Sequence, residues 1–151
     1  MGLFTWLLAA VRPKRISDPL FGKLLFMKAA AGYWEGRCEF IPLGHQIEVF
    51  IDAGEGGPSE QHREFYRLIE QRFPELMESL RPVLEREYRG WMHKDLVQTV
   101  EEEFALSSLS IPDGGVSPLE WEVTFECASD QEHVFTVTMK DWSPEIVTID
   151  G

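Results

Sequence analysis

Residues 119–127 read LEWEVTFEC and alternate strictly between apolar and polar side chains. The apolar set is Leu119, Trp121, Val123, Phe125 and Cys127. The polar set is Glu120, Glu122, Thr124 and Glu126. Successive side chains of a β-strand point to opposite faces, so this period of two predicts a strand with one buried side and one solvent-facing side. The fold is therefore expected to contain a sheet with an acidic open face.

Similar patterns recur on both sides of this stretch. They are rich in large apolar residues and are separated by turn residues such as Pro, Gly and Asp. The predicted strands are residues 21–28, 33–41, 45–53, 104–111, 119–127, 132–139 and 145–149. Short connections between them favour antiparallel neighbours.

The segment between the third and fourth predicted strands has a helical pattern instead. Ser59 follows a glycine-rich turn and has the side chain of a helix N-cap. Apolar residues then recur at helical spacing up to residue 80. Because proline is tolerated in the first turn of a helix and disruptive inside it, we predict one helix over 59–73 and a second over 74–88. Pro82 is expected to kink or shorten the second helix.

The predicted order of elements is βββααββββ. Segregation of strands from helices is typical of α+β domains, here a mostly antiparallel sheet with two helices packed on one face. We assign residues 18–151 to this single domain and residues 1–17 to an N-terminal docking segment.

The N-terminal segment is apolar from residue 2 to residue 11 apart from Thr5, and Arg12, Lys14 and Arg15 follow. Its positive charge comes after the apolar run, whereas a secretory signal places it before. The run is also shorter than the roughly 20 residues that span a bilayer. We expect it to pack on its own domain or on a partner, with weak membrane-surface contact through residues 2–15 as the alternative. The predicted location is cytoplasmic.

Charge is distributed unevenly along the chain. Its net charge is −12, yet residues 1–94 contain 13 basic and 13 acidic residues. Residues 95–151 contain 13 acidic residues and one basic residue, Lys140. The candidate partner-binding face is Glu120, Glu122, Glu126 and Glu132. It fits a basic protein partner, with a merely solubilising surface as the alternative, and it disfavours nucleic acid, which requires basic patches.

No motif specifies a chemical reaction. The glycines at 54, 56 and 57 lack a Walker lysine, and no GxSxG elbow occurs. The histidines are scattered, and His62, in a first helical turn, is expected to be solvated. The run 101–103 of three glutamates is expected to be a solvated surface, and Cys38 and Cys127 to be buried thiols. We therefore predict no catalytic, cofactor-binding or metal-binding residue.

Three short motifs are similar to those of a known group. They are DPLFGKL at 18–24, WEG at 34–36 and GPSEQ at 57–61. Over about the first 90 residues they resemble a family of small bacterial domains of unknown function, with a DPxFGxL strand, a WxG strand and a helix that starts on Gly-Pro-Ser or Gly-Pro-Thr. The resemblance implies structural motifs without active-site residues. Because some such domains accompany polymorphic toxin systems, it also implies an immunity or binding role.

These observations favour a non-enzymatic binding or immunity-type protein that uses its acidic C-terminal sheet face. The alternative is a small-molecule-binding or hydrolytic enzyme with a pocket between helices and sheet. Neither the identity of a partner nor an oligomeric state follows from the sequence.

Overall fold

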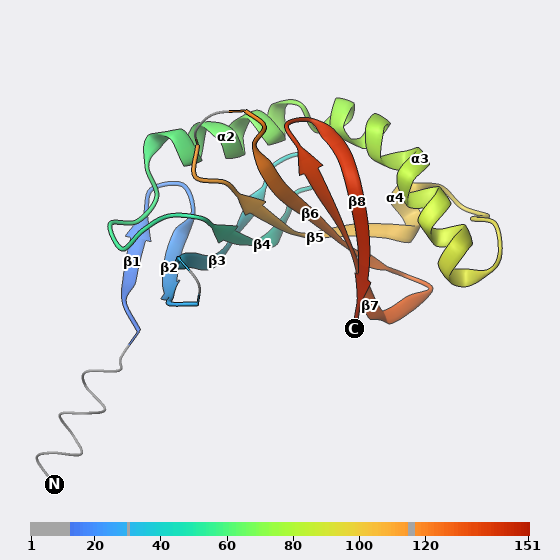
Figure 1. Ribbon diagram of the computed structural model, residues 1–151, viewed down its shortest axis with the longest axis horizontal. Coiled ribbons are helices and arrows are strands. Elements are labelled where there is room, and N and C mark those ends of the chain that lie inside the picture. Colours follow the sequence, from blue (N-terminus) through green and yellow to red (C-terminus); the bar gives the residue numbers. More distant parts are fainter. Residues whose placement is uncertain (1–12, 30, 115–116) are drawn as a thin grey trace, which may run out of the picture.

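Strands with alternating apolar and polar side chains lie before and after a helical segment. They pair into one sheet (Figure 1). The computed structural model describes residues 13–29, 31–114 and 117–151. The strands are β1 (Arg15–Asp18), β2 (Gly22–Met27), β3 (Tyr33–Phe40), β4 (His45–Ile51), β5 (Phe104–Ile111), β6 (Glu120–Cys127), β7 (Asp130–Lys140) and β8 (Ser143–Asp150). The helices are α2 (Glu60–Gln71), α3 (Phe73–Met92) and α4 (Val100–Glu103).

The eight strands lie in the sheet in their sequence order, from β1 to β8. All neighbours are antiparallel except β4 and β5, which are parallel. Parallel neighbours need a long crossover connection, and here α2, α3 and α4 supply it. The predicted α+β class with a mostly antiparallel sheet is thereby confirmed.

The order of elements differs from the prediction. Over the described residues, four strands, three helices and four strands replace the expected βββααββββ. The additional strand is β1, whose sequence RISD has no run of apolar residues. It forms because its backbone pairs with β2, from Arg15 opposite Leu25 to Asp18 opposite Gly22. Residues 15–17, assigned above to the docking segment, therefore pair in the sheet, whereas residues 2–12 lie outside the described ranges.

The helix boundaries follow the prolines only in part. α2 ends at Gln71, and α3 begins at Phe73 with Pro74 in its first turn. Pro82 lies inside α3, but the helix continues to Met92 instead of ending near residue 88. Buried side chains on both sides of Pro82, including Leu80 and Leu84, hold this helix against the sheet. No helix in the described ranges is long and apolar enough to cross a membrane.

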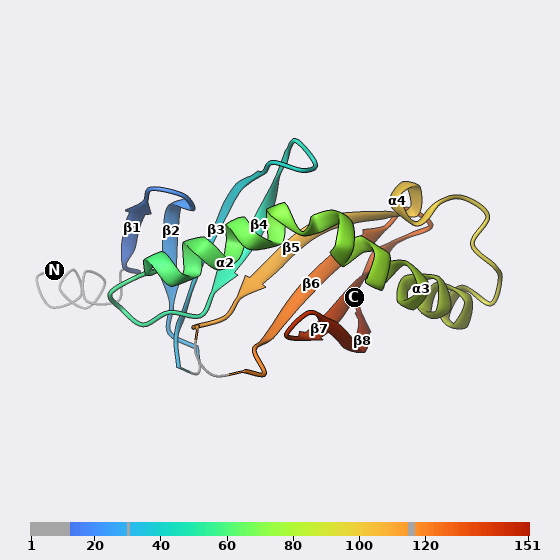
Figure 2. The ribbon, with the colours of Figure 1, turned by 90° about the horizontal axis from the view of Figure 1, so that it is seen from above.

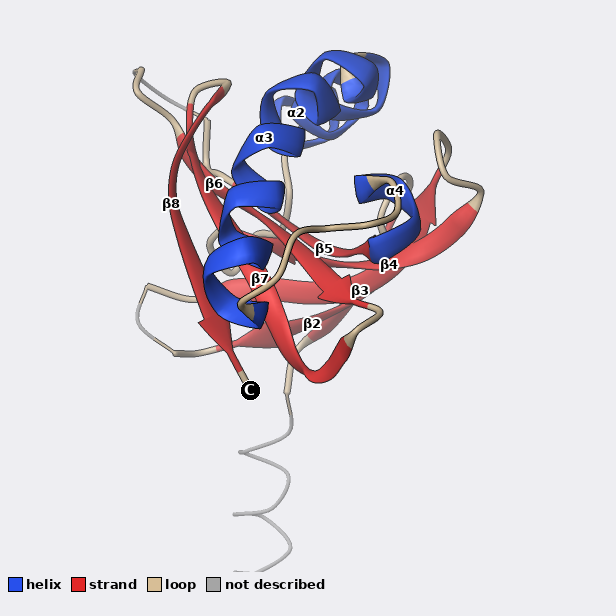
Figure 3. Cartoon of the chain, turned by 90° about the vertical axis from the view of Figure 1, so that its right-hand side faces the viewer, coloured by secondary structure: helices blue, strands red, loops and turns tan. Residues whose placement is uncertain are grey.

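The core lies between the helices and one face of the sheet. Figures 1 and 2 show α2 and α3 running across the strands, and Figure 3 shows that no helix of the described residues lies on the opposite sheet face. The sheet curves toward the helices, so that β8 contacts α3. The largest fully buried side chains are Trp34, Trp121, Tyr66, Phe21, Phe40, Phe125 and Phe135. We call the uncovered side of the sheet the open face.

The motifs that carry the family resemblance have structural roles here. The Asp18 carboxylate accepts hydrogen bonds from the N–H groups of Leu20 and Phe21, each at 2.9 Å, and so shapes the β1–β2 turn. Arg63 of α2 bonds the same carboxylate at 3.0 Å. At Gly36, an added Cβ would lie 2.7 Å from the carbonyl oxygen of Lys23 on β2, so only glycine fits between these strands.

Candidate functional site

The acidic side chains of β6 lie on the open face. Glu120, Glu122 and Glu126 are exposed, whereas the residues between them alternate toward the core. On the neighbouring strand, Glu120 lies opposite Lys140 and Glu122 lies opposite Thr138. Three of the four residues predicted as a partner-binding face thus share one strand and one side of the sheet.

Glu132, the fourth of these residues, is exposed near the far end of the same pair of strands. It lies two residues before Val134, which is opposite Glu126, and the ladder is irregular there, near the β6–β7 hairpin turn. Because β7 pairs with Glu120 at Lys140, eight residues further on, Glu132 lies roughly 25 Å from Glu120. The period-two pattern does not encode this irregularity of the ladder.

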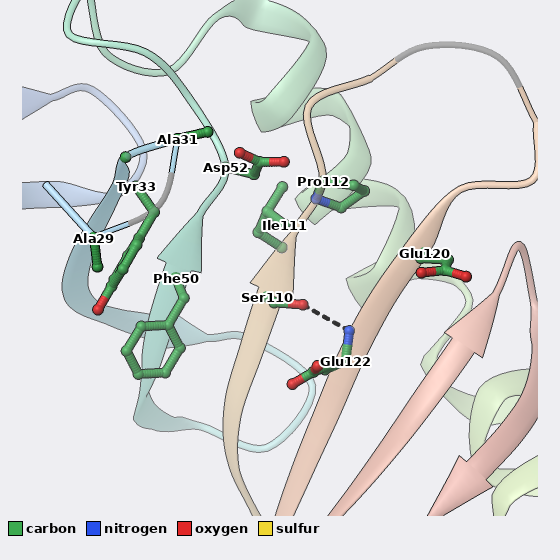
Figure 4. A pocket seen from close by; sticks show the side chains of 11 residues that line it. Ala29, Ala31, Tyr33, Phe50, Asp52, Ser110, Ile111, Pro112, Glu120 and Glu122 are labelled. Atoms are coloured by element: carbon green, nitrogen blue, oxygen red, sulfur yellow. Dashed lines mark hydrogen bonds between the residues drawn. The ribbon is translucent and has the colours of Figure 1, made fainter. Parts of the chain in front are cut away.

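A cavity of about 490 Å³ opens on the same face, where the parallel strands β4 and β5 end (Figure 4). We call it the β4–β5 cavity. Its lining comes from β3, β4, β5 and β6, together with the β2–β3 connection. The side chains most relevant to binding are Tyr33, Phe50, Asp52, Ser110, Glu120 and Glu122. The β4–β5 cavity therefore lies where residues 1–94, which carry no net charge, meet the acidic residues 95–151.

Two aromatic rings form one side of this cavity. Tyr33 of β3 and Phe50 of β4 are half-buried, with ring centroids 6.3 Å apart and planes inclined by 66°. Both residues belong to the polar set of their strands, which includes Glu35, Arg37 and Glu48. The rings are therefore apolar surface beside polar side chains, on a sheet face that no helix of the described residues covers.

Carboxylates surround these rings. Phe50, Ser110 and Glu122 follow one another across β4, β5 and β6, with the Glu122 N–H donating to Ser110 Oγ at 2.6 Å. The Glu122 side chain extends over β5 on the side of Phe50 (Figure 4). Two strand spacings separate Phe50 from Glu122, or about 10 Å between their backbones.

Asp52 is held at the end of β4 by a buried histidine. The Ser59 N–H donates to His62 Nδ1 at 3.0 Å, so His62 Nε2 carries the proton and donates to the Asp52 carbonyl at 2.8 Å. The Asp52 N–H in turn donates to the Ile111 carbonyl at 2.9 Å. His62 is only 3% exposed. The expectation of a solvated His62 is therefore wrong, because this side chain joins the start of α2 to the end of β4.

Two ion pairs involve carboxylates of the open face. Lys140 lies 4.0 Å from Glu120, and Arg37 pairs with Glu48 at 3.3 Å. Within the described ranges, no basic side chain forms an ion pair with Glu122 or Asp52. Exposed pairs such as these contribute little to stability, and a competing ligand can displace them. The β4–β5 cavity is therefore a site of net negative charge.

Sequence reasoning identified Glu120 and Glu122 but missed Tyr33, Phe50 and Asp52. A signal was present, because Phe50 stands in the solvent-facing set of its strand between polar neighbours. An aromatic residue at such a position indicates either packing under a loop or a binding surface. Its proximity to Glu122 depends on the parallel pairing of β4 with β5, which the local pattern does not encode.

Glu103, Cys127 and Cys38 lie outside the β4–β5 cavity and are buried in the fold. Glu103 is 2% exposed, which corrects the expectation of a solvated 101–103 run. Its carboxylate accepts from the Ser129 N–H at 2.8 Å and the Cys127 thiol at 3.2 Å. Burial, and secondarily this hydrogen bond, raise the pKa of Cys127 to about 11, so the thiol is a poor nucleophile. Cys38 is likewise a buried free thiol.

The described residues form no metal centre, and the cavity beside α2 is small. In residues 13–29, 31–114 and 117–151, no group of three His, Cys, Asp or Glu side chains could hold a metal ion. Beside α2, a cavity of about 220 Å³ is lined by Gln61, Glu64, Phe65 and Leu68 and by residues that follow β5. This volume is below the roughly 300 Å³ at which small-molecule pockets begin, and its lining lacks a nucleophile and a histidine.

Comparison with known proteins adds no relative. No family model, no curated protein and no solved structure matches this chain.

Proposed function

We propose that this chain is a non-enzymatic binding protein, of an immunity type, that docks a basic protein partner on the open face of β5–β8. The observation that carries the proposal is the row formed by Glu120, Glu122 and Glu126, on a sheet face that the described helices leave uncovered. The immunity role rests on the resemblance of the first 90 residues to small bacterial domains, and it includes a cytoplasmic location.

Electrostatics support a basic partner over a neutral one. Between residues 95 and 151 the single basic residue is Lys140, against 13 acidic residues. A surface of one sign steers an oppositely charged protein during diffusional encounter and repels wrong partners. Exposed like charges on adjacent positions also destabilise a sheet modestly, a cost that a bound cationic surface removes.

An enzymatic role has weaker support. It requires a pocket between helices and sheet, whereas the core there is filled by large side chains such as Trp34, Tyr66 and Trp121. The 220 Å³ cavity beside α2 supplies no nucleophile or general base in a suitable setting. We therefore favour recognition over catalysis.

The test is a capture experiment with matched charge reversals. The wild-type protein, the open-face variant Glu120→Lys/Glu122→Lys/Glu126→Lys and the helix-side variant Glu64→Lys/Glu78→Lys/Glu85→Lys are immobilised and exposed to lysate of the native cell. All six side chains are exposed, and both variants change the net charge equally. We expect the wild type and the helix-side variant to retain the same basic protein, and the open-face variant to lose it.

The dependence of capture on ionic strength is the second measurement. Capture by the wild type should weaken between low and physiological ionic strength, since exposed charges are screened beyond about 8 Å at 0.15 M. Equal capture by both variants, with both folded by circular dichroism, contradicts docking on the open face.

A further inference from the structure

The β4–β5 cavity combines two features that a solubilising acidic surface does not need. One is the pair of half-buried rings, Tyr33 and Phe50, on the polar side of the sheet. The other is the set of carboxylates around them, of which Asp52 and Glu122 have no ion-pair partner among the described residues. Aromatic faces and carboxylates together are the groups that bind organic cations in proteins.

We propose that the β4–β5 cavity receives an arginine side chain of the basic partner. The guanidinium lies over the Phe50 ring and Ser110, and Glu122 accepts its N–H groups, with Asp52 and Glu120 at the rim. This inference rests on the proposed function, because it names the group by which the partner is anchored to the open face. The arginine contact would add a specific interaction to the long-range attraction between the acidic open face and the basic partner.

Dimensions and position support a side chain as the occupant. The cavity holds about 490 Å³ and is open to solvent on the sheet surface, so an extended side chain can enter from a docked partner. Its floor lies between Phe50 and Glu122, about two strand spacings apart. A ring on one side and a carboxylate on the other match the flat faces and the edge donors of a guanidinium.

The chemistry favours arginine over lysine. A guanidinium is planar, stacks on aromatic rings and presents several N–H donors in one plane to carboxylate oxygens. An ammonium is a compact, strongly hydrated point charge that gains less from a ring face. Buried arginine anchors are also frequent among the side chains that dominate protein interfaces.

Anionic and neutral occupants fit less well. No lysine or arginine lines the cavity among the described residues, so a phosphate or carboxylate would meet Asp52, Glu120 and Glu122 without compensation. A neutral apolar group would contact the rings but leave these carboxylates facing it. A cation with a flat apolar surface satisfies both parts of the lining.

A peptide titration tests the proposal without knowledge of the partner. The full chain is titrated with the peptide acetyl-Gly-Arg-Gly amide and with its lysine and citrulline analogues, while the ring resonances of Tyr33 and Phe50 are followed by NMR. Citrulline keeps the shape of arginine but lacks its charge. We expect the arginine peptide to shift both rings, the lysine peptide to bind about threefold more weakly, and the citrulline peptide at least tenfold more weakly.

Single substitutions locate the contact. Phe50→Leu and Glu122→Gln should each weaken arginine-peptide binding about fivefold, whereas Glu126→Gln, on the same strand but outside the cavity, should leave it unchanged. Circular dichroism and thermal unfolding verify that each variant is folded. Equal binding of citrulline, or wild-type binding by folded Phe50→Leu, overturns the proposal.

The same Phe50→Leu variant separates this proposal from the proposed function, because it preserves every charge on the open face. Lost partner capture by Phe50→Leu supports the arginine anchor. Wild-type capture by Phe50→Leu, together with lost capture by the open-face variant, overturns the anchor and leaves the docking face standing. Full capture by the open-face variant overturns the docking face itself.

Discussion

Carboxylates occupy two contrasting environments in this protein. Asp18 and Glu103 are buried, and each accepts several hydrogen bonds from backbone or side-chain donors. Glu120 and Glu122 are exposed on the open face, where one weak ion pair with Lys140 is the nearest cationic contact of Glu120. The contrast teaches that the donors around a carboxylate decide its role: Asp18 and Glu103 hold the fold together, whereas Glu120 and Glu122 leave their oxygens free for a ligand.

The largest effect that this contrast predicts is on the stability of a Glu103→Ala variant. Removing the carboxylate leaves the Ser129 N–H and the buried Cys127 thiol without their acceptor, which should cost about 3 kcal/mol of unfolding free energy. Urea denaturation measures it. The neighbouring Glu102 is exposed, so Glu102→Ala serves as the control and should change stability by less than about 0.5 kcal/mol. Similar losses in both variants would mean that the buried hydrogen bonds contribute little.

The next largest effect concerns the pH dependence of stability, to which the buried carboxylates Asp18 and Glu103 should contribute. Burial opposes the charge of Asp18, but hydrogen bonds from Phe21, Arg63 and Leu20 outweigh it and lower its pKa. Burial likewise opposes the charge of Glu103, but hydrogen bonds from Ser129 and Cys127 lower its pKa. A lowered folded-state pKa contributes stability above the unfolded values of about 4, and this contribution disappears as the pH falls through the folded values.

Unfolding free energies measured between pH 7 and pH 2.5 check this sign. The wild type should lose stability steeply below about pH 4. Asp18→Asn, which starts less stable, should show a shallower loss over the same range. The variant Glu120→Gln/Glu122→Gln/Glu126→Gln should keep the wild-type slope. A shallower slope in that variant instead would assign the acid sensitivity to the open face.

A smaller effect is expected on the stability of the same triple glutamine variant at neutral pH. The three side chains are exposed, and their removal as charges relieves repulsion without breaking a buried contact, so the change should be within about 0.5 kcal/mol. Thermal unfolding gives the stability, and capture of the basic partner gives the function. If the variant unfolded, these glutamates would contribute to the stability of the fold, as Asp18 and Glu103 do.

The smallest effect concerns Lys140, which neutralises part of the charge of Glu120 across the β6–β7 pair. Lys140→Gln should tighten binding of the arginine peptide about twofold, because a surface ion pair is worth only a fraction of a kilocalorie per mole. The NMR titration measures the affinity, and Lys94→Gln, elsewhere on the chain, is the charge-matched control. Weaker binding by Lys140→Gln would contradict a cationic ligand.

Local pattern was sufficient for most strands and for the helix junction. Period two assigned Trp121 and Phe125 to the core and Glu122 to the open face, as observed. Pro74 marked the start of α3, since its missing N–H belongs among the free donors of a first turn. The misses have different causes. β1 lacks an apolar run and forms by backbone pairing with the adjacent β2. The burial of Glu103 depends on Cys127 and Ser129, more than 20 positions away, and that of His62 on its contact with the end of β4, so the local pattern around each residue does not reveal it.

By itself, the sequence determined the strand faces, the α+β class and the concentration of negative charge after residue 94, because these follow from side-chain alternation and composition. Only the tertiary structure decided that β4 and β5 pair in parallel. That pairing brings Phe50 within two strand spacings of Glu122, although 72 positions of sequence separate them. Strand pairing depends on hydrogen bonds between backbones, which carry no side-chain pattern, so the β4–β5 cavity exists only in the folded chain.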